Sequence, residues 1–443
     1  MSVRSTASTR VSGCSTFTPT SAWTAGPASR SARWRPSTTR TTSRRNGRST
    51  PRRTWTSSRT SDLPAARPRW ARSTTTSTWS QICHRSSTTS KGVQLPDFPW
   101  DRLAGAKELA SRIPGGMVDL SVGTPVDPTP EIVRTALADA ADAPGYPTVH
   151  GTDAVRVAVT DWLSRRLGVD ASPADVLPLI GTKEFVAWLP TLLGLGSADA
   201  VASPAVAYPT YVVGALIAGC RTVDVGQPAA LTWLNSPANP TGEVMSVEQL
   251  RDVVASARKQ GTVVVSDECY IELGWDAQPV SILHPDVCGG DHRGLLAVHS
   301  LSKRSNMAGY RFGFAVGDPD LTGRLLAVRK HAGMMVPLPV QAAATAALRD
   351  DAHVQAQRER YGRRRLLLRD SLTAAGFHID GSEAGLYLWA TRGERCWDTV
   401  SWLAQRGILV APGDFYGEGG REHVRVALTA SDADVARAAT RLS

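Results

Sequence analysis

Two patterns of apolar and polar positions alternate along residues 93–443. Short apolar runs of four to six residues are separated by longer segments in which apolar residues recur every three or four positions. The first pattern predicts strands and the second predicts amphipathic helices. Several apolar runs are continuous, which is typical of parallel strands covered on both faces, so an α/β fold is expected. The predicted strands are Met117–Val122, Asp175–Ile180, Ala200–Ser203, Leu231–Asn235, Thr262–Ser266, Leu295–Ser300, Gly313–Val316 and His423–Leu428. The predicted helices are Asp101–Arg112, Pro130–Asp142, Asp153–Leu167, Val247–Gln260, Asp320–Ala332, Ala352–Ala375 and Cys396–Gln405.

Residues 1–92 show neither pattern. They are rich in Ser, Thr, Arg, Ala and Pro, and carry 17 Lys and Arg against a single acidic residue, Asp62. Such a segment cannot bury enough apolar surface to offset its chain entropy, and we expect it to be disordered. The remaining residues have 33 basic and 39 acidic side chains, so the overall charge of +10 arises in the first segment. We therefore expect no nucleic-acid binding by the main body of the chain.

Three interpretations of residues 1–92 compete: a basic nucleic-acid tail, an organelle transit peptide, and translation in the wrong reading frame. Five tryptophans, from Trp23 to Trp79, argue against the first two. A shift of one base recodes the spaced alanines 22, 25, 28 and 32 as cysteines, and the result resembles the C-x2-C-x2-C-x3-C-P run of a bacterial ferredoxin. Our hypothesis is that an upstream ferredoxin gene is read out of frame and that the protein begins near Val93.

The six cysteines, at positions 14, 83, 220, 269, 288 and 396, form no C-x-x-C pair, and no secretory signal precedes them. We expect a cytoplasmic protein with reduced thiols and no metal site. The longest apolar stretch, Val186–Leu195, is interrupted by Pro190 and Gly194, so no membrane segment is predicted.

Polar side chains follow several predicted strands, at the edge where open α/β sheets bind ligands. Gly181-Thr182-Lys183-Glu184 begins a helix whose free N–H groups could bind a phosphate, although a plain strand-to-helix turn explains it as well. Asn239 lies in the turn-rich segment 234–242 and could simply favour a turn. Asp267 ends an apolar strand, with Tyr270 three residues later, and an aspartate there could also serve as a helix N-cap.

Two further sites carry cationic groups. Ser300-Leu301-Ser302-Lys303 follows an apolar strand, with Arg311 eight residues beyond. Two hydroxyls, an amine and a guanidinium suit a dianionic phosphate with an amine beside it, although a lone loop lysine is usually a solvated surface group. Arg425 lies within the apolar run 424–428 and needs an anionic partner if it is buried; a solvent-facing strand position is the alternative.

In combination these motifs resemble the class I/II aminotransferases, pyridoxal-phosphate enzymes of fold type I. The resemblance runs from about Phe98 to the C-terminus and rests on N-P-T-G at 239–242, D-x-x-Y at 267–270, S-x-S-K at 300–303 with Arg311, and Arg425. Further segments are similar to those of N-succinyldiaminopimelate aminotransferases of high-GC bacteria: 98–101 (F-P-W-D), 120–125 (L-S-V-G-T-P), 144–147 (P-G-Y-P), 180–184 (I-G-T-K-E), 331–337 (H-A-G-M-M-V-P) and 411–417 (A-P-G-D-F-Y-G).

The resemblance implies a role for each matching residue. Lys303 would bind pyridoxal 5'-phosphate as a Schiff base and move the substrate proton, and Asp267 would keep the ring nitrogen protonated. Asn239 and Tyr270 would hydrogen-bond the ring oxygen, and Tyr208 would stack on the ring. The phosphate would be held by Thr182, Lys183, Ser300, Ser302 and Arg311, with Tyr146 reaching across from a partner subunit of a homodimer. Arg425, with the Gly123 backbone beside it, would bind the substrate α-carboxylate.

The resemblance also implies the domain organisation and the reaction. A three-layer α/β/α large domain would span residues 141–345, and a smaller α+β domain would combine residues 93–140 with 346–443. L-glutamate would donate its amino group in a ping-pong reaction to N-succinyl-2-amino-6-ketopimelate, in diaminopimelate and lysine biosynthesis. Lys183, Lys330 and His331 are candidates for binding the distal carboxylates. A transaminase with another acceptor and a C–S β-lyase remain open, because they use the same catalytic residues. An aminotransferase-like transcription regulator is a weaker alternative, since residues 1–90 lack the apolar pattern of a helix-turn-helix.

Overall fold

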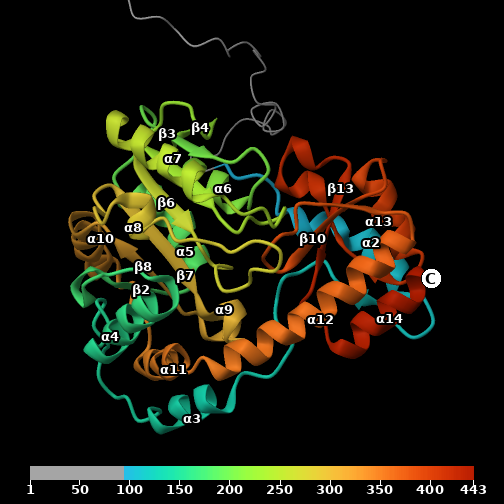
Figure 1. Ribbon diagram of the computed structural model, residues 1–443, viewed down its shortest axis with the longest axis horizontal. Coiled ribbons are helices and arrows are strands. Elements are labelled where there is room, and N and C mark those ends of the chain that lie inside the picture. Colours follow the sequence, from blue (N-terminus) through green and yellow to red (C-terminus); the bar gives the residue numbers. More distant parts are fainter. Residues whose placement is uncertain (1–93) are drawn as a thin grey trace, which may run out of the picture. The chain divides into compact units, whose positions relative to one another are not determined.

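The computed structural model describes residues 94–443, and its centre is a seven-stranded sheet (Figure 1). Four neighbouring pairs in the sheet are parallel, and β8 pairs antiparallel with both β2 and β7. The strand order is β2 (Leu177–Leu179), β8 (Gly313–Gly317), β7 (Leu295–Ser300), β6 (Val263–Asp267), β5 (Leu231–Asn235), β3 (Ala200–Ser203) and β4 (Arg221–Asp224).

Helices cover both faces of this sheet. Neighbouring strand residues point to opposite sides, so a continuous apolar strand presents apolar side chains on both faces. Val264 of β6 packs into one apolar cluster and Val265 into another. The first cluster contains residues of α4 (Asp153–Trp162), α7 (Val247–Gln260) and α11 (Leu338–Arg349). The second contains residues of α5 (Thr182–Leu192), α6 (Thr210–Ile217) and α10 (Pro319–Ala332). This three-layer arrangement confirms the predicted α/β fold and explains the continuous apolar runs.

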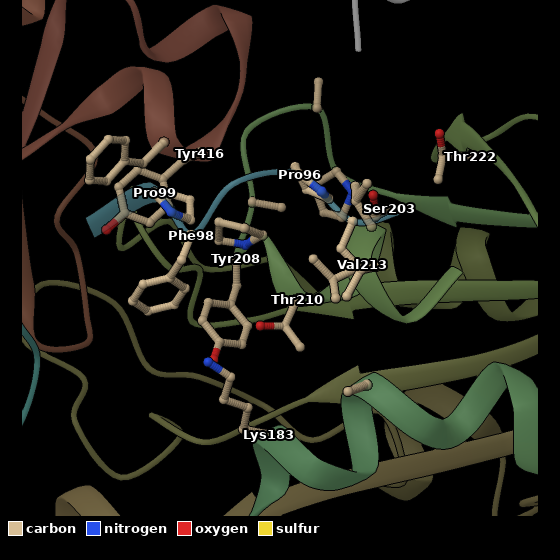
Figure 2. Close-up of a pocket in the computed structure, with 18 of the residues that line it drawn as sticks. Pro96, Phe98, Pro99, Lys183, Ser203, Tyr208, Thr210, Val213, Thr222 and Tyr416 are labelled. Atoms are coloured by element: carbon tan, nitrogen blue, oxygen red, sulfur yellow. The ribbon is translucent and has the colours of Figure 1, made fainter. Parts of the chain in front are cut away.

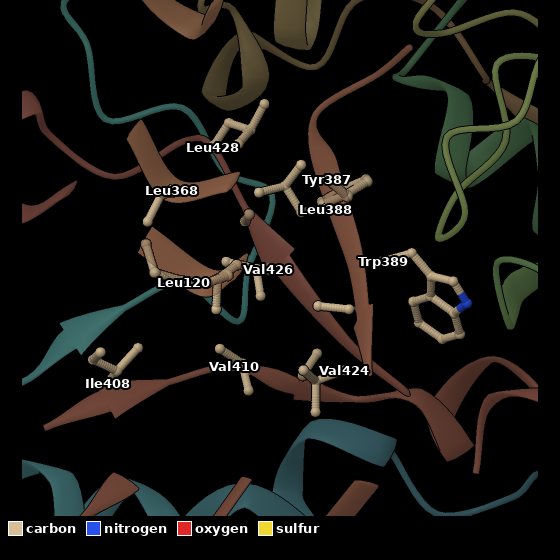
Figure 3. Close-up of a cluster of buried hydrophobic side chains, with 14 of the residues drawn as sticks. Leu120, Leu368, Tyr387, Leu388, Trp389, Ile408, Val410, Val424, Val426 and Leu428 are labelled. Carbon is tan, nitrogen blue, oxygen red and sulfur yellow. The ribbon is translucent and has the colours of Figure 1, made fainter. Parts of the chain in front are cut away.

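A second core surrounds a four-stranded antiparallel sheet with the order β12 (Ala411–Pro412), β13 (His423–Ala427), β10 (Tyr387–Thr391) and β9 (His378–Asp380). Figure 3 shows this core, in which Leu120 joins Leu388, Val424 and Val426. The N-terminal strand β1 (Val118–Asp119) pairs in parallel with β11 (Ile408–Leu409), so the two ends of the described chain meet here. The helices of this region are α2 (Ala104–Ser111), α12 (Ala352–Ala374), α13 (Cys396–Ala404) and α14 (Asp432–Leu442). Two other helices are α3 (Glu131–Asp139), which packs on α11, and the short α8 (Pro285–Cys288).

Most predicted elements are confirmed, with differences at their ends. The strands at 200–203, 231–235 and 295–300 and the helix at 247–260 have the predicted bounds. The helix predicted over 153–167 instead changes to a π turn at Leu163–Leu167, because Gly168 ends it in the left-handed conformation. The helix predicted over 101–112 begins as a 3-10 turn, Pro99–Leu103.

Five substantial elements were not predicted: β4, β10, α6, α11 and α14. Helix α6 is apolar on nearly all sides, and α11 is rich in alanine, so neither shows the amphipathic period. None of the helices in residues 94–443 is long and apolar enough to cross a membrane. The hypothesis about residues 1–92 lies outside the described residues and stays a prediction, which intact mass of the natural gene product would test.

Candidate active site

A cavity of about 680 Å³ opens at the carboxyl ends of the parallel strands. It brings together twelve of the thirteen residues that the sequence predicted for catalysis, cofactor binding or the α-carboxylate: Gly123, Thr182, Lys183, Tyr208, Asn239, Asp267, Tyr270, Ser300, Ser302, Lys303, Arg311 and Arg425. The exception, Tyr146, is 97% exposed in the segment between α3 and α4 and does not line the cavity of its own chain. Its role across a subunit boundary stays a prediction.

Asp267 lies at the end of β6 and is only 7% exposed. The Tyr211 hydroxyl donates a hydrogen bond to its Oδ2 at 2.8 Å, and the backbone N–H of Cys269 donates to Oδ1 at 3.2 Å. Burial raises the pKa of the Asp267 carboxyl, although both hydrogen bonds oppose the shift. The Asp267 carboxylate makes no ion pair with any residue of 94–443. A ligand with a cationic or N–H donor group would therefore be favoured beside it in the cavity.

The loop that carries Asn239 is held by another asparagine, Asn235, at the end of β5. The Asn235 side-chain amide donates to the Asp267 carbonyl at 2.9 Å, and its Oδ1 accepts from the Asn239 N–H at 2.7 Å. Asn235 and Asp267 are also opposite each other in the sheet register. This buried amide therefore fixes the Asn239 loop to the strand of Asp267, a role that the sequence motif did not reveal.

Lys303 lies on the single-turn helix α9 (Leu301–Arg304), directly after β7. The Ser300 hydroxyl caps this turn by accepting the Ser302 N–H at 3.1 Å. The Lys303 amine contacts the Gly123 carbonyl, whereas the sequence analysis expected the Gly123 backbone beside Arg425. Burial lowers the pKa of Lys303, and the nearby Arg425 and Arg311 lower it further, while Tyr387 and Cys269 oppose the shift. The amine is therefore easier to deprotonate than an ordinary lysine.

Arg425 enters the cavity from β13 of the other sheet and is 3% exposed, so the solvent-facing alternative is wrong. Its guanidinium donates to Asn239 Oδ1 at 3.0 Å and to the Ser121 carbonyl at 2.7 Å. It lies 4.0 Å from the Tyr387 ring centroid and 5.0 Å from that of Tyr416. Burial alone would lower the pKa of Arg425, but the surrounding tyrosines outweigh it and the pKa is raised. Within residues 94–443 no carboxylate pairs with this cation, which leaves it free to bind an anionic ligand.

The side of the cavity that is predicted to hold the phosphate combines a helix N-terminus with Arg311. Gly181 has a positive φ of 73° just before α5, and a Cβ at this position would collide with the Arg311 guanidinium. Glycine therefore lets Arg311 approach the N–H groups that begin at Thr182. Ser300 and Ser302 also line the cavity, so cation, hydroxyls and free N–H groups are available together for an anion.

Tyr387 is an active-site residue that the sequence analysis missed. Its hydroxyl lies 3.2 Å from that of Tyr270, and a Cβ on Gly123 would collide with it. Burial would raise the pKa of Tyr387, but Arg425 and Lys303 and the hydrogen bond with Tyr270 lower it overall. Its strand, β10, pairs with the strand of Arg425, and the apolar run at 386–390 was the local signal that could have identified this strand.

The three candidates for distal carboxylate binding differ in position. Lys183 lines the cavity, and its amine lies 5.6 Å from the Phe98 ring centroid. Lys330 and His331 are exposed on α10 and do not line the cavity, so within this chain they are helix-surface residues.

Comparisons with known proteins agree with this site. Residues 115–442 match the family described as "Aminotransferase class I and II". The chain is 62% identical over 359 residues to a "Probable aminotransferase" of Mycobacterium tuberculosis, covering 79% of this chain and 86% of the relative. It is 58% identical over 357 residues to the 4-dedimethylamino-4-oxo-anhydrotetracycline transaminase OxyQ of Streptomyces rimosus, covering 79% and 99%. An LL-diaminopimelate aminotransferase of Dehalococcoides mccartyi is 31% identical, covering 80% and 98%. A solved structure of a "probable N-succinyldiaminopimelate aminotransferase" from Thermus thermophilus has a TM-score of 0.71 at 28% identity, covering 78% and 99%.

The residues present fit pyridoxal 5'-phosphate. Asp267 offers a buried carboxylate without a cationic partner among the described residues, as a protonated ring nitrogen requires. Ser300, Ser302, Arg311 and the α5 N-terminus would hold the phosphate, and Lys303 would bind the cofactor covalently. The matched family, the 328 matched residues and this donor set lead to one conclusion: the chain belongs to the class I and II aminotransferases, pyridoxal-phosphate-dependent enzymes of fold type I.

Proposed function

We propose that this aminotransferase takes the amino group of L-glutamate and passes it to a longer keto acid or ketone. The observation that carries the proposal is the pairing, in one cavity, of an amine with a lowered pKa, Lys303, and a fully charged guanidinium, Arg425. The first can move a proton at the substrate α-carbon, and the second can bind an α-carboxylate through two parallel hydrogen bonds.

Each residue contributes a separate part of this reaction. Bound pyridoxal phosphate supplies the carbonyl that receives the amino group and the ring that withdraws electrons. Asp267 would hold a proton at the ring nitrogen, and Tyr211 and the Cys269 N–H fix the orientation of its carboxylate. Tyr270 and Asn239 line the cavity and would hydrogen-bond the ring oxygen, and Tyr208 would pack on the ring face. A second copy of the chain supplies Tyr146 to the phosphate, which makes the working unit a homodimer.

The first candidate acceptor is N-succinyl-2-amino-6-ketopimelate, in cytoplasmic diaminopimelate and lysine biosynthesis. The diaminopimelate aminotransferases among the relatives support it. Lys183 supports it as well, because it lines the cavity and its side-chain amine is not needed if the phosphate is held through the backbone N–H groups at the start of α5. Its amine could pair with a distal carboxylate.

The second candidate acceptor is a ring ketone of the kind named for the Streptomyces rimosus relative. The 58% identity to that transaminase supports it, and so does a largely apolar second cavity beside the first.

The test is the half-reaction of the purified holoenzyme with single amino acids, followed by conversion of the bound cofactor to its amine form. We expect L-glutamate to complete the half-reaction and 2-oxoglutarate to reverse it. Release of pyruvate and a thiol from cystathionine, without cofactor conversion by glutamate, would instead identify a C–S β-lyase. A Lys330→Ala variant is the matched control for Lys303→Ala, because Lys330 is exposed on α10 and away from the cavity.

A further inference from the structure

A second cavity, of about 350 Å³, lies beside the active-site cavity. Four residues line both cavities: Phe98, Trp100, Lys183 and Tyr208. Figure 2 shows Lys183 and Tyr208 at one end of the second cavity, with Ser203, Val213 and Thr222 toward the other. A molecule bound through Arg425 could therefore extend past Tyr208 into this space. Its size falls in the range of about 300–1,000 Å³ that is usual for small-molecule sites.

The walls of this cavity are built by rigid and small residues. The extended segment 95–100 forms one side, and the start of α6 and the edge strand β4 form the other. Trp100 anchors the extended segment, since its ring centroid lies 5.4 Å from that of Phe415 and 6.4 Å from that of Tyr416. Prolines and alanines at 96, 99, 204, 205, 207 and 209 provide much of the remaining lining and leave space that larger side chains would fill.

The second cavity differs from the first in charge. The active-site cavity is lined by Lys303, Arg311 and Arg425, whereas the second cavity has Lys183 as its single lining cation, at the shared end. Two exposed carboxylates, Asp97 and Asp224, line it as well. An anionic group entering this space would meet like charge, so an uncharged group is favoured.

Two aromatic residues of the wall carry buried donors. Trp100 Nε1 and the Tyr416 hydroxyl are buried and have no acceptor within residues 94–443. Burial raises the pKa of Tyr416 well above its usual range, so the hydroxyl stays a donor. Ser203, Thr210 and Thr222 add three hydroxyls along the cavity. A ligand with a carbonyl or hydroxyl oxygen could accept these hydrogen bonds, whereas a plain hydrocarbon could not.

We propose that this second cavity binds the distal end of the amino acceptor, and that this end is an uncharged, largely apolar ring that carries oxygen acceptors. The proposal rests on the proposed aminotransferase function and narrows its substrate class. It favours a ring-bearing acceptor over one that ends in carboxylates.

The experiment compares two acceptors with the full-chain holoenzyme and L-glutamate as donor. One is 2-oxo-5-(4-acetylphenyl)pentanoate, which ends in an uncharged ring with a carbonyl oxygen, and the other is 2-oxopimelate, which ends in a carboxylate. Val213→Trp fills the second cavity from a residue that does not line the first, and Val328→Trp on the exposed face of α10 is the matched control. We expect the unmodified enzyme to prefer the acetylphenyl acceptor in kcat/KM by about tenfold or more. Val213→Trp should remove that preference and leave the 2-oxopimelate value within about twofold, and Val328→Trp should change neither.

If Val213→Trp folds poorly, a second cavity variant and a direct binding measurement test the same point. Ala187→Phe narrows the same cavity from α5 and should have the same effect. Titration calorimetry of 4-(4-acetylphenyl)butyrate should show binding to the unmodified holoenzyme and its loss in either cavity variant. A preference for 2-oxopimelate that neither variant alters would overturn the proposal and support the succinylated acceptor, with the aminotransferase function intact. Failure of glutamate to convert the bound cofactor would instead overturn the proposed function itself.

Discussion

The two sheets of this protein each place one buried cation in the active-site cavity, and the two cations behave in opposite ways. Lys303 follows β7 of the seven-stranded sheet, and its pKa is lowered by burial and by neighbouring arginines. Arg425 lies on β13 of the four-stranded sheet, and its pKa is raised by the tyrosines around it. The same cavity therefore holds an amine prepared to lose its proton and a guanidinium that keeps its charge.

The difference follows from the surroundings and from the chemistry of each group. Arg425 lies over aromatic rings, which attract a delocalised cation, and it donates two hydrogen bonds to neutral oxygens. Lys303 is a compact amine with one carbonyl contact and two arginines nearby. The proposed reaction needs one group that moves a proton and one that binds a carboxylate, and these two residue types suit those two tasks.

The largest expected effect comes from removing the amine. Lys303→Ala should lower kcat by at least about 10⁴-fold, as loss of a covalent catalytic group does. Borohydride reduction followed by intact mass should show the cofactor attached to the unmodified protein and absent from the variant. Lys330→Ala should match the unmodified protein in both measurements. Covalent cofactor on the Lys303→Ala protein would show that another lysine carries it.

Replacing Arg425 by lysine, the residue type of the other buried cation, tests the comparison directly. Arg425→Lys retains the charge but loses the paired hydrogen bonds, each of which to a charged group contributes about 1.5–3 kcal/mol. We expect KM for L-glutamate to rise about 10- to 100-fold, while cofactor binding stays unchanged. An unchanged KM would mean that Arg425 does not bind the α-carboxylate.

Tyr211 is expected to act as a positioning residue for Asp267. Tyr211→Phe removes the 2.8 Å hydrogen bond from the tyrosine hydroxyl to the Asp267 carboxylate. The buried carboxylate then has one hydrogen-bond donor fewer, and losing such a donor carries a free-energy cost of about 1–3 kcal/mol. The loss should raise the pKa of Asp267 further and weaken pyridoxal-phosphate binding about tenfold. Fluorescence titration of the apoprotein with the cofactor measures this, with Tyr310→Phe as a control outside the cavity lining. Equal affinities for both variants would contradict the role.

The smallest effect is expected from Tyr387→Phe. Tyr387 opposes the lowering of the Lys303 pKa, so its removal should lower that pKa further. Because the amine reacts when unprotonated, the acid edge of covalent cofactor uptake by the apoprotein should move to lower pH. The lost hydrogen bond to Tyr270 is worth about 0.5–1.5 kcal/mol, so the rate at neutral pH should change by less than about tenfold. A shift toward higher pH would show that the tyrosine lowers the Lys303 pKa instead.

The fold was predictable to the extent that its elements carry a local pattern. Strands β3, β5 and β7 and helix α7 have the predicted bounds, because continuous apolar runs and a capped amphipathic period are local features. Strand β4 and helix α6 were missed because an edge strand is half polar and a buried helix lacks a polar face. Strand β10 was missed although the apolar run at 386–390 is a local signal, and its pairing with β13 sets Tyr387 beside the strand of Arg425.

The active site shows the same division between local features and long-range contacts. The sequence by itself determined which chemical groups stand at the strand ends, since Asp267, Lys303 and Arg425 each adjoin or lie in an apolar run. Only the tertiary structure decided their partners. Tyr211 meets Asp267 from 56 positions away, Tyr387 meets Tyr270 from 117, and Arg425 meets Asn239 from 186. Such contacts are set by how the two sheets pack, and the second cavity arises from the same packing of segment 95–100 against α6. A local pattern specifies an element and its polar ends, whereas burial, pKa and cavity shape depend on neighbours that are distant in the sequence.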